Sequence, residues 1–302
     1  MHSDFDLYTP GTVTEALEIL AKTKKDNMII AGGTDAVIQL RDGRRSPGHV
    51  ISISRIRELH GVSGDGETVR IGAGSTFSEL EQNHLLRDRV RVLSGACAEV
   101  GSPQIRNLGT IGGNVINASV AGDSITALLA LDASLVLKSL RGDRAVKLRD
   151  YYAQKSVPCI EPDELLTDLV FQCPDETTAT TFYKLGKRNA LAIVDISGAA
   201  VLRWNAAGIC KYASVRGGAL ARFPLRFTEV ERYLVGRPVT RGTLFGCMGL
   251  LSEAVYQSIK HRPLEVEYKK ESVRGVFEHV FEDLLAQYAA RGEAAMPGRW
   301  AV

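Results

Sequence analysis

Glycine residues cluster at the ends of short, mostly apolar runs in the first 120 residues of this 302-residue chain. The run 27–31 (NMIIA) passes straight into Gly32-Gly33, and the run 69–71 (VRI) ends at Gly72-Ala73-Gly74. Both runs predict short buried strands. A third cluster occupies 109–114. Because glycine has no Cβ, its backbone can approach a ligand closely or adopt a positive φ. The pattern therefore predicts loops at the ends of strands whose backbone can approach a ligand closely.

Two of these clusters, AGGTD at 31–35 and TIGGN at 110–114, indicate a phosphate site. Consecutive backbone N–H groups form nests that bind phosphate oxygens. A tight turn explains one Gly-Gly equally well, but two such loops can grip a pyrophosphate from both sides. We therefore expect a Cβ at Gly112 to obstruct the phosphate. Neither loop is a Gly-x-Gly-x-x-Gly and no P-loop is present, which argues against a nicotinamide dinucleotide or a nucleoside triphosphate held in the usual way.

Composition excludes several other classes of protein. Lys plus Arg is 37 and Asp plus Glu is 35, so bulk charge does not drive binding to a polyanion such as nucleic acid. The five Cys form no CxxC or CxC, and none of the six His has a partner at ligand spacing, so we assign no metal site. No catalytic residue is assigned either. A polar N-terminus and the lack of an apolar span predict a cytoplasmic chain.

The expected pattern of secondary structure changes near residue 175. Before it we expect an α+β arrangement, and after it an antiparallel meander followed by helices and a flexible tail at 289–302. Thr14 is the expected N-cap of the first helix, and Thr76 that of a later one, with Glu79 as its capping-box partner. The basic turn 41–45 (RDGRR) is expected to be solvated, with a subunit contact as the alternative. The expected helices are 12–22, 75–86, 93–100, 124–131, 227–234, 244–258 and 272–288; the expected strands are 27–31, 49–53, 69–71, 134–138, 180–185, 193–204 and 211–216.

Four stretches together carry a resemblance to a known family. They are AGGTD at 31–35, SPQIRNLGTIGGN at 102–114 with AGD at 121–123, FYKLGKR at 182–188 and VRGG at 215–218. This pattern closely resembles the FAD-binding medium subunit of molybdenum hydroxylases, the family of xanthine dehydrogenase, carbon monoxide dehydrogenase and nicotinate dehydrogenase. The run YKKESV at 268–273 is most similar to the nicotinate dehydrogenase branch, with a purine-oxidising relative close by.

The resemblance, which covers residues 4–288, implies a fold. It is α+β: a two-lobed FAD-binding domain of the vanillyl-alcohol oxidase (PCMH) type, then an α+β C-terminal domain of antiparallel sheet plus helices. The implied boundaries are 1–56 for the first lobe, 57–176 for the second, 177–288 for the C-terminal domain and 289–302 for the tail.

The resemblance also implies which residues bind FAD. Outside the loops, Asp123 would bind ribityl or ribose hydroxyls, Leu166 and Lys184 would lie by the flavin, and Ile193 would lie against the ring. An ionised Lys184 near the flavin N1/C2=O region would stabilise negative charge on reduced flavin. The alternatives are a helix N-cap for Asp123, a solvated Lys184 and a core strand position for Ile193. The loop residues implied are Ile29, Ile30, Ala31, Gly32, Gly33, Thr34, Asp35, Ala36, Gly101, Thr110, Ile111, Gly112, Gly113 and Asn114.

By the same resemblance, the chain is a flavoprotein electron-transfer subunit. A large partner subunit would hydroxylate an N-heterocycle at a molybdopterin centre. Electrons would then pass through two [2Fe–2S] clusters on a small subunit to FAD, and on to NAD, NADP or another acceptor. The chain lacks cysteines for such clusters, so the hypothesis requires partners, arranged as a dimer of heteromers. The alternatives are a free-standing FAD oxidase of the same fold and an assembly subunit that has lost FAD.

Overall fold

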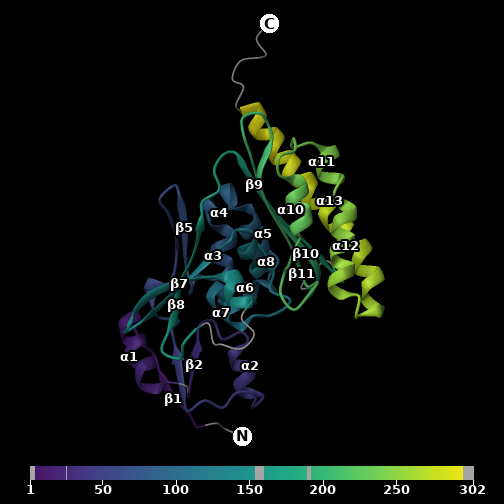
Figure 1. The fold of residues 1–302 in the computed structure, drawn as a ribbon. Helices are drawn as coiled ribbons and strands as arrows, with labels where there is room; N and C mark the ends of the chain where they lie inside the picture. The colour runs from purple at the N-terminus through teal and green to yellow at the C-terminus, as the bar shows by residue number, and fades with distance from the viewer. Residues whose placement is uncertain (1–3, 25, 154–159, 189–191, 295–302) are drawn as a thin grey trace. The chain divides into compact units, whose positions relative to one another are not determined.

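The computed structural model describes residues 4–24, 26–153, 160–188 and 192–294, and the chain divides into two compact units (Figure 1). Both units combine helices with strands, so the α+β prediction is confirmed. The final passage of the chain into unit 2 lies close to the predicted boundary after residue 176. Unit 1 is Met1–Asn83, Val100–Ser119 and Asp132–Gln172; unit 2 is His84–Glu99, Val120–Leu131 and Cys173–Val302.

Unit 1 contains two sheets. The first has the order β1-β3-β2, with both pairs parallel. The second has the order β4-β5-β8-β6-β7, with all pairs antiparallel. The first sheet falls in the predicted lobe 1–56 and the second in 57–176. Their strands are β1 Asp6–Tyr8, β2 Asn27–Ile30 and β3 His49–Ser52, then β4 Val62–Gly64, β5 Thr68–Gly72, β6 Ser134–Ser139, β7 Gly142–Lys147 and β8 Leu165–Gln172.

Short helices connect and cover the sheets of unit 1. The amphipathic α1 buries Ala16, Leu17 and Leu20 against Ile51 of β3, because these positions recur on one face of the helix. The next helix, α2, follows β2 directly after the glycine loop. The helices of unit 1 are α1 Val13–Thr23, α2 Ala36–Arg41, the 3-10 turn η1 Arg57–Leu59, α3 Phe77–Gln82, α6 Pro103–Leu108, α7 Ile111–Asn117 and α9 Leu148–Ala153.

Unit 2 is built on one antiparallel sheet of order β12-β11-β10-β9, as the predicted meander requires. Gly198 and Gly217 are paired across β10 and β11 and face Val276, Phe227 and other core side chains of the C-terminal helices. On the opposite face Gly218 lies against Thr126. The elements are β9 Thr178–Gly186, β10 Val194–Trp204, β11 Cys210–Gly218, β12 Leu225–Arg226, α4 His84–Arg89, α5 Arg91–Ala98, α8 Asp123–Ala130, α10 Thr228–Leu234, α11 Arg241–Phe245, α12 Met248–Ile259 and α13 Pro263–Ala294.

The ends of several helices differ from the sequence expectation. The first helix is capped by Thr12, not Thr14, because the Thr12 hydroxyl accepts the Glu15 N–H. The helix expected at 75–86 is interrupted at Asn83, whose extended backbone separates α3 from α4. The capping box of Thr76 with Glu79 is confirmed. The last helix continues to Ala294, so 289–294 is helical and not tail; residues 295–302 lie outside the described part of the chain.

Candidate functional site

A cavity of about 590 Å³ in unit 1 brings most of the predicted loop residues together. It lies between the loop that follows β2 and the start of α7, with the beginning of β8 as a further wall. Its volume is typical of a small-molecule or cofactor pocket. The predicted residues that line it are Ile29, Ala31, Gly32, Gly33, Thr34, Asp35, Ala36, Thr110, Gly112, Gly113, Asn114 and Leu166.

Three predicted residues of unit 1 do not line this cavity. Ile111 is fully buried behind the loop that carries it, and Ile30 lies half-buried in β2. Gly101 has a φ of +49° and packs against Ile105, whose side chain does line the cavity. A direct role of Gly101 in FAD binding therefore stays a prediction.

The first glycine loop offers a row of backbone donors to the cavity. Among the described residues, the N–H groups of Gly32, Gly33, Thr34 and Asp35 have no hydrogen-bond acceptor. Gly33 has a φ of +72°, which glycine adopts without strain. Asp35, the residue before α2, makes no side-chain cap bond, so its carboxylate does not occupy this row. Consecutive free N–H groups of this kind suit phosphate oxygens.

The second glycine loop is arranged differently. Ile111 donates its N–H to the Ser75 carbonyl at 3.0 Å, and Gly112 donates to the Ala73 carbonyl at 2.9 Å. The Gly113 N–H is bonded to the hydroxyl of Thr110, which caps α7. These three N–H groups already have acceptors within the protein. The loop therefore lines the cavity mainly with the exposed backbone of Gly113.

The reason for glycine at two of these positions is packing within the protein. A Cβ at Gly112 would lie 2.6 Å from both the Cβ and the carbonyl oxygen of Ala73. A Cβ at Gly32 would lie 1.7 Å from the Leu108 carbonyl oxygen. The expected obstruction of phosphate by a Gly112 side chain is therefore wrong in its cause, because the side chain would collide with the backbone before it reached a ligand.

The cavity also contains residues that the sequence did not predict to line it. Arg45 is the one Lys or Arg among the described residues that line it. Its turn was expected to be solvated or at a subunit contact, and only the count of arginines in that turn could have drawn attention to it. Phe77, Ile105 and Ile116 supply apolar wall. The polar and apolar parts match a ligand with a charged group and flat rings.

Glu164 gives the cavity a fixed carboxylate just before β8. Its two oxygens accept from Arg144 Nε at 2.6 Å and Nη2 at 2.7 Å, and from the Glu161 N–H at 2.8 Å. The Arg144 guanidinium holds the pKa of Glu164 below its usual value. The pair fixes the chain directly before Leu165 and Leu166, which form the adjoining wall.

Unit 2 brings two of the predicted residues, Asp123 and Lys184, into direct contact. Lys184 Nζ lies 2.7 Å from Asp123 Oδ2 and donates to the Glu99 carbonyl at 2.8 Å. Both side chains are 5% exposed. Lys184 is therefore not solvated, and Asp123 is the first residue of α8 while Gly122 is its N-cap. Both alternative interpretations from the sequence are thus wrong.

Asp123 and a neighbouring hydroxyl are incompletely satisfied. Within the described residues, Asp123 Oδ1 and Ser197 Oγ are buried and have no hydrogen-bond partner. Ser197 is paired with Lys184 on one side and with Gly218 on the other, so the three form one row across the sheet. Burial raises the pKa of Asp123 to about 6, although the Lys184 ammonium opposes the shift. Buried acceptors without a donor are rare in proteins, and a ligand hydroxyl is one donor that would satisfy Asp123 Oδ1.

Ile193 lies just before β10 and is 78% exposed. The alternative interpretation, that Ile193 is a core residue of the strand, is therefore wrong. Contact with a flavin ring stays a prediction for this side chain. So do the other predicted roles of individual residues at the cofactor.

Comparison with known proteins identifies the class that this fold and these residues define. Residues 3–171 match the family model for the FAD binding domain in molybdopterin dehydrogenase, and 181–284 match that for the CO dehydrogenase flavoprotein C-terminal domain. The chain belongs to the family of FAD-binding subunits of molybdenum hydroxylases, and the predicted resemblance is confirmed.

Individual relatives support the assignment. The chain is 44% identical over 288 residues to the nicotinate dehydrogenase FAD-subunit of Eubacterium barkeri, covering 94% of this chain and 97% of the relative. It is 30% identical over 262 residues to the xanthine dehydrogenase FAD-binding subunit of Escherichia coli O157:H7, covering 86% and 88%. A chain of reconstituted CO dehydrogenase from Oligotropha carboxidovorans superposes with a TM-score of 0.83 at 25% identity, covering 95% and 99%. The FAD-binding domain followed by a C-terminal domain is thereby confirmed.

The described residues fit FAD. The free N–H row of the first loop suits the diphosphate, and the cavity volume suits a cofactor. In unit 2 the orphaned Asp123 oxygen suits a hydroxyl donor. In the part of the chain that the structure describes, no helix is both long and apolar enough to cross a membrane.

Proposed function

We propose that this chain is the FAD-carrying electron-transfer subunit of a molybdopterin-dependent hydroxylase that acts on an N-heterocycle of the nicotinate or xanthine type. The observation that carries the proposal is the cavity of unit 1, with its row of free N–H groups, in a chain 44% identical to a nicotinate dehydrogenase FAD-subunit. Electrons would come from [2Fe–2S] clusters of a small partner and leave to NAD, NADP or another acceptor. The assembly would be a cytoplasmic dimer of heteromers with a molybdopterin-binding large subunit.

Bound FAD would supply the redox chemistry, because a flavin accepts and passes on electrons. The residues of the chain would bind and orient it. The N–H groups of 32–35 would hold the diphosphate, with Arg45 as its counter-charge. Leu166 and Ile105 would pack on flat parts of the ligand. Lys184 would be held in place by Asp123 and the Glu99 carbonyl, and Asp123 Oδ1 would accept from a ligand hydroxyl.

The flavin content of the purified chain is the first test. We expect a flavin absorbance spectrum and close to one FAD per chain after reconstitution. A colourless protein that cannot be reconstituted would contradict the proposal and favour an assembly subunit that has lost FAD.

The partners provide the second test. Purification from the native host should recover a molybdenum-containing chain and an iron–sulfur chain together with this one. A flavin-loaded chain that purifies alone and turns over an organic substrate with O₂ would instead support a free-standing oxidase. Reduction of the flavin by nicotinate and by xanthine, each added to the complex, would identify the heterocycle.

A further inference from the structure

The run 268–273 (YKKESV) lies near the start of α13 and contains a lysine that is almost completely buried. Lys269 is 8% exposed. Its Nζ donates to the Asp195 carbonyl at 3.2 Å and to the Ala219 carbonyl at 2.8 Å. The Asp195 carboxylate lies 3.8 Å from the same ammonium. Because lysine is almost never fully buried unless it is paired, these contacts are what keep Lys269 inside the protein.

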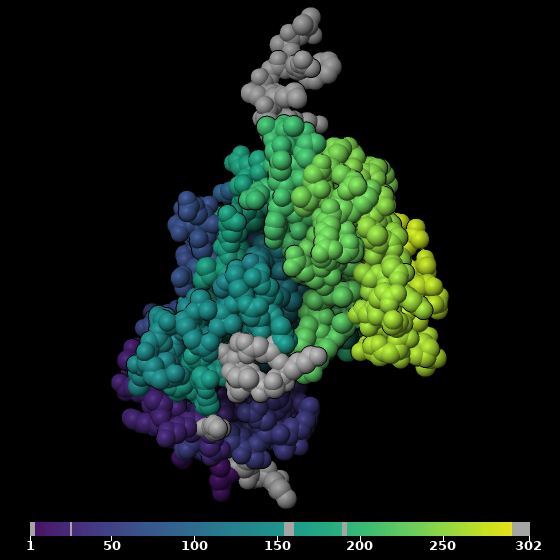
Figure 2. Space-filling model, in the orientation of Figure 1, coloured from purple at the N-terminus to yellow at the C-terminus, as the bar shows by residue number. Residues whose placement is uncertain are grey.

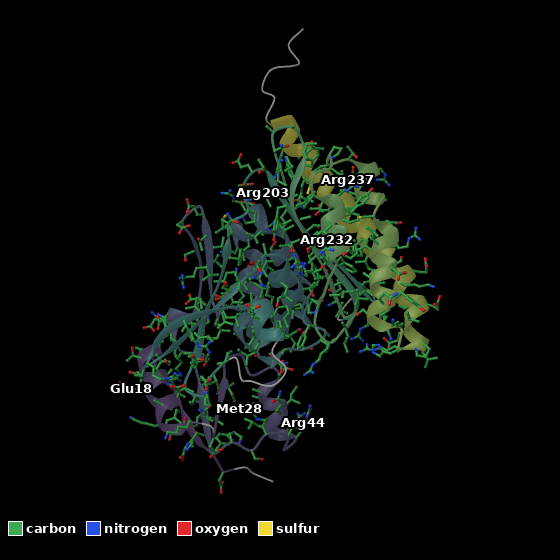
Figure 3. The ribbon with its side chains drawn as sticks, viewed as in Figure 1. Glu18, Met28, Arg44, Arg203, Arg232 and Arg237 are labelled. Carbon is green, nitrogen blue, oxygen red and sulfur yellow. The ribbon has the colours of Figure 1, made fainter. Side chains whose placement is uncertain are left out.

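Lys269 joins two strands at the point where their pairing ends. The ladder between β10 and β11 begins at Ser197 of β10, so Asp195 and Ala219 lie just beyond it. The ammonium donates to the carbonyl groups of both residues there. Figures 1 and 2 show α12 and α13, coloured yellow-green to yellow, side by side in unit 2, and Arg203, labelled in Figure 3, marks the other end of β10.

Asp195 is the extra residue of a β-bulge. On β9, Gly186 is paired with Val194 and the preceding residue is paired with Ile196. Asp195 is thus inserted between two consecutive pairs. Ile196 belongs to the core that packs against α13, and the Asp195 carboxylate faces an ammonium of the same helix. Two consecutive side chains therefore lie on one side of the sheet, which a regular strand does not allow.

The bulge decides which side chain lies on the Lys184 side of the sheet. Lys184 and Gly186 are two residues apart on β9 and share that side. Val194 is opposite Gly186, so it lies on the same side. Without the bulge, Asp195 would be opposite Gly186 instead. A second carboxylate would then lie on the side where Asp123 already contacts the ammonium. The bulge replaces it with a buried valine.

Stability alone does not explain the buried charges of Lys269 and Asp195. Asp195 Oδ2 is buried and has no hydrogen-bond partner among the described residues. Removing charges from water costs free energy, and apolar side chains of similar volume often stabilise a protein as well or better. Buried polar groups can instead specify one register, because a wrong register leaves them without a partner. In this sheet the competing register is the unbulged one.

We propose that Lys269 is a positioning residue of the flavin site, because it holds Asp195 on the α13 side of the sheet and so fixes the bulge. The bulge places Val194, and not a second carboxylate, beside Lys184. This rests on the proposed function, in which Lys184 lies by the flavin. A carboxylate on that side would repel the negative charge of reduced flavin and compete with Asp123 for the ammonium. Lys269 thus acts on the cofactor without contacting it.

The test measures the midpoint potential of the flavin in the complete complex. Lys269→Met removes the ammonium and keeps most of the side-chain volume. We expect the ratio of reduced to oxidised flavin at a fixed potential to fall about tenfold, since one more charge in the protein changes an equilibrium by this order. Lys269→Arg keeps a charged donor and should keep the potential. The matched control is Lys270→Met, because the next lysine pairs with Glu267 of its own helix. It should leave the potential unchanged.

A second substitution distinguishes positioning of the bulge from a purely structural role. Lys269→Met combined with Asp195→Asn has no second carboxylate to place beside Lys184, so its flavin potential should return to that of the unchanged complex. A purely structural contact would instead make the double variant no better than the single one. A potential that stays low in the double variant would overturn the proposal. So would an unchanged potential in Lys269→Met.

Asp195→Asn alone tests the proposal even if Lys269→Met does not fold. The Asp195 carboxylate faces Lys269 on the other side of the sheet from Lys184, so its neutralisation should leave the flavin potential unchanged. A rise in the potential would show that the carboxylate already acts on the flavin, and would overturn the proposal. The proposed function would fail by a different result, namely an unchanged complex that contains no FAD.

Discussion

Lys184 Nζ lies 2.7 Å from Asp123 Oδ2 at a site where both side chains are 95% shielded from solvent. The ammonium satisfies one carboxylate oxygen and leaves the other without a donor in the described part of the chain. The pair is therefore arranged to hold a charge in place and to accept one more hydrogen bond. A buried pair built only for stability would be expected to satisfy both oxygens.

The first prediction concerns the stability of the chain without FAD. Burial raises the pKa of Asp123 from 3.8 to about 6, so the folded state binds a proton more tightly than the unfolded state. The stability from this group is therefore present below pH 4 and lost as pH rises through 6. At about 1.4 kcal/mol per pKa unit the loss is about 3 kcal/mol. We expect urea unfolding to show Asp123→Asn more destabilised, relative to the unchanged protein, at pH 4 than at pH 7.

The second prediction concerns FAD affinity and pH. If Asp123 Oδ1 accepts from a hydroxyl of the ligand, the ionised carboxylate is the better acceptor, because hydrogen bonds to charged groups are the stronger ones. FAD binding should then tighten between pH 5 and pH 7. Fluorescence titration of the chain would show this, and Asp123→Asn should flatten the profile. An unchanged pH profile in Asp123→Asn would remove Asp123 from the site.

The third prediction separates two adjacent glycines. Gly112→Ala should unfold or strongly destabilise unit 1, because its Cβ would lie 2.6 Å from the Ala73 backbone. Gly113→Ala meets only the Thr110 hydroxyl, at 2.9 Å, and costs at most about 1–2 kcal/mol through the helix cap. Gly113→Ala should remain folded and bind FAD at least tenfold more weakly. Tight FAD binding by this variant would exclude the second loop from the phosphate site.

The fold could be predicted where the local sequence pattern and the packing favour the same secondary structure. Strand-end glycines, alternating runs and the Thr76 capping box depend on near neighbours, and the structure confirms them. The predictions from the sequence were wrong for features that depend on residues far away in the chain. Gly112 is a glycine because of Ala73, and Lys184 is buried because the Glu99 carbonyl and Asp123 meet it from other segments. No local pattern contains those contacts.

The same distinction applies to the candidate site. The motif residues of the two loops could be named in advance, since their spacing carries the resemblance. Arg45 and Glu164 could not, because they enter the cavity through folding of a turn and of the segment before β8. Neither residue lies in a recognisable motif. Only the three-dimensional cavity shows that a cation and a carboxylate line it.

The last prediction tests Arg45 as the counter-charge of the diphosphate. The cavity contains no other cationic side chain among the described residues, and a hydrogen bond to a charged group contributes about 1.5–3 kcal/mol. Arg45→Ala should therefore weaken FAD binding about 10- to 100-fold, and added salt should reduce the remaining affinity less than it does in the unchanged chain. Arg44→Ala is the matched control: it removes a neighbouring guanidinium that is bonded to Asp42 and does not line the cavity, so FAD affinity should stay the same. Equal effects of the two substitutions would mean that the basic turn acts through its overall charge, whereas loss in Arg45→Ala alone would assign the contact to that side chain.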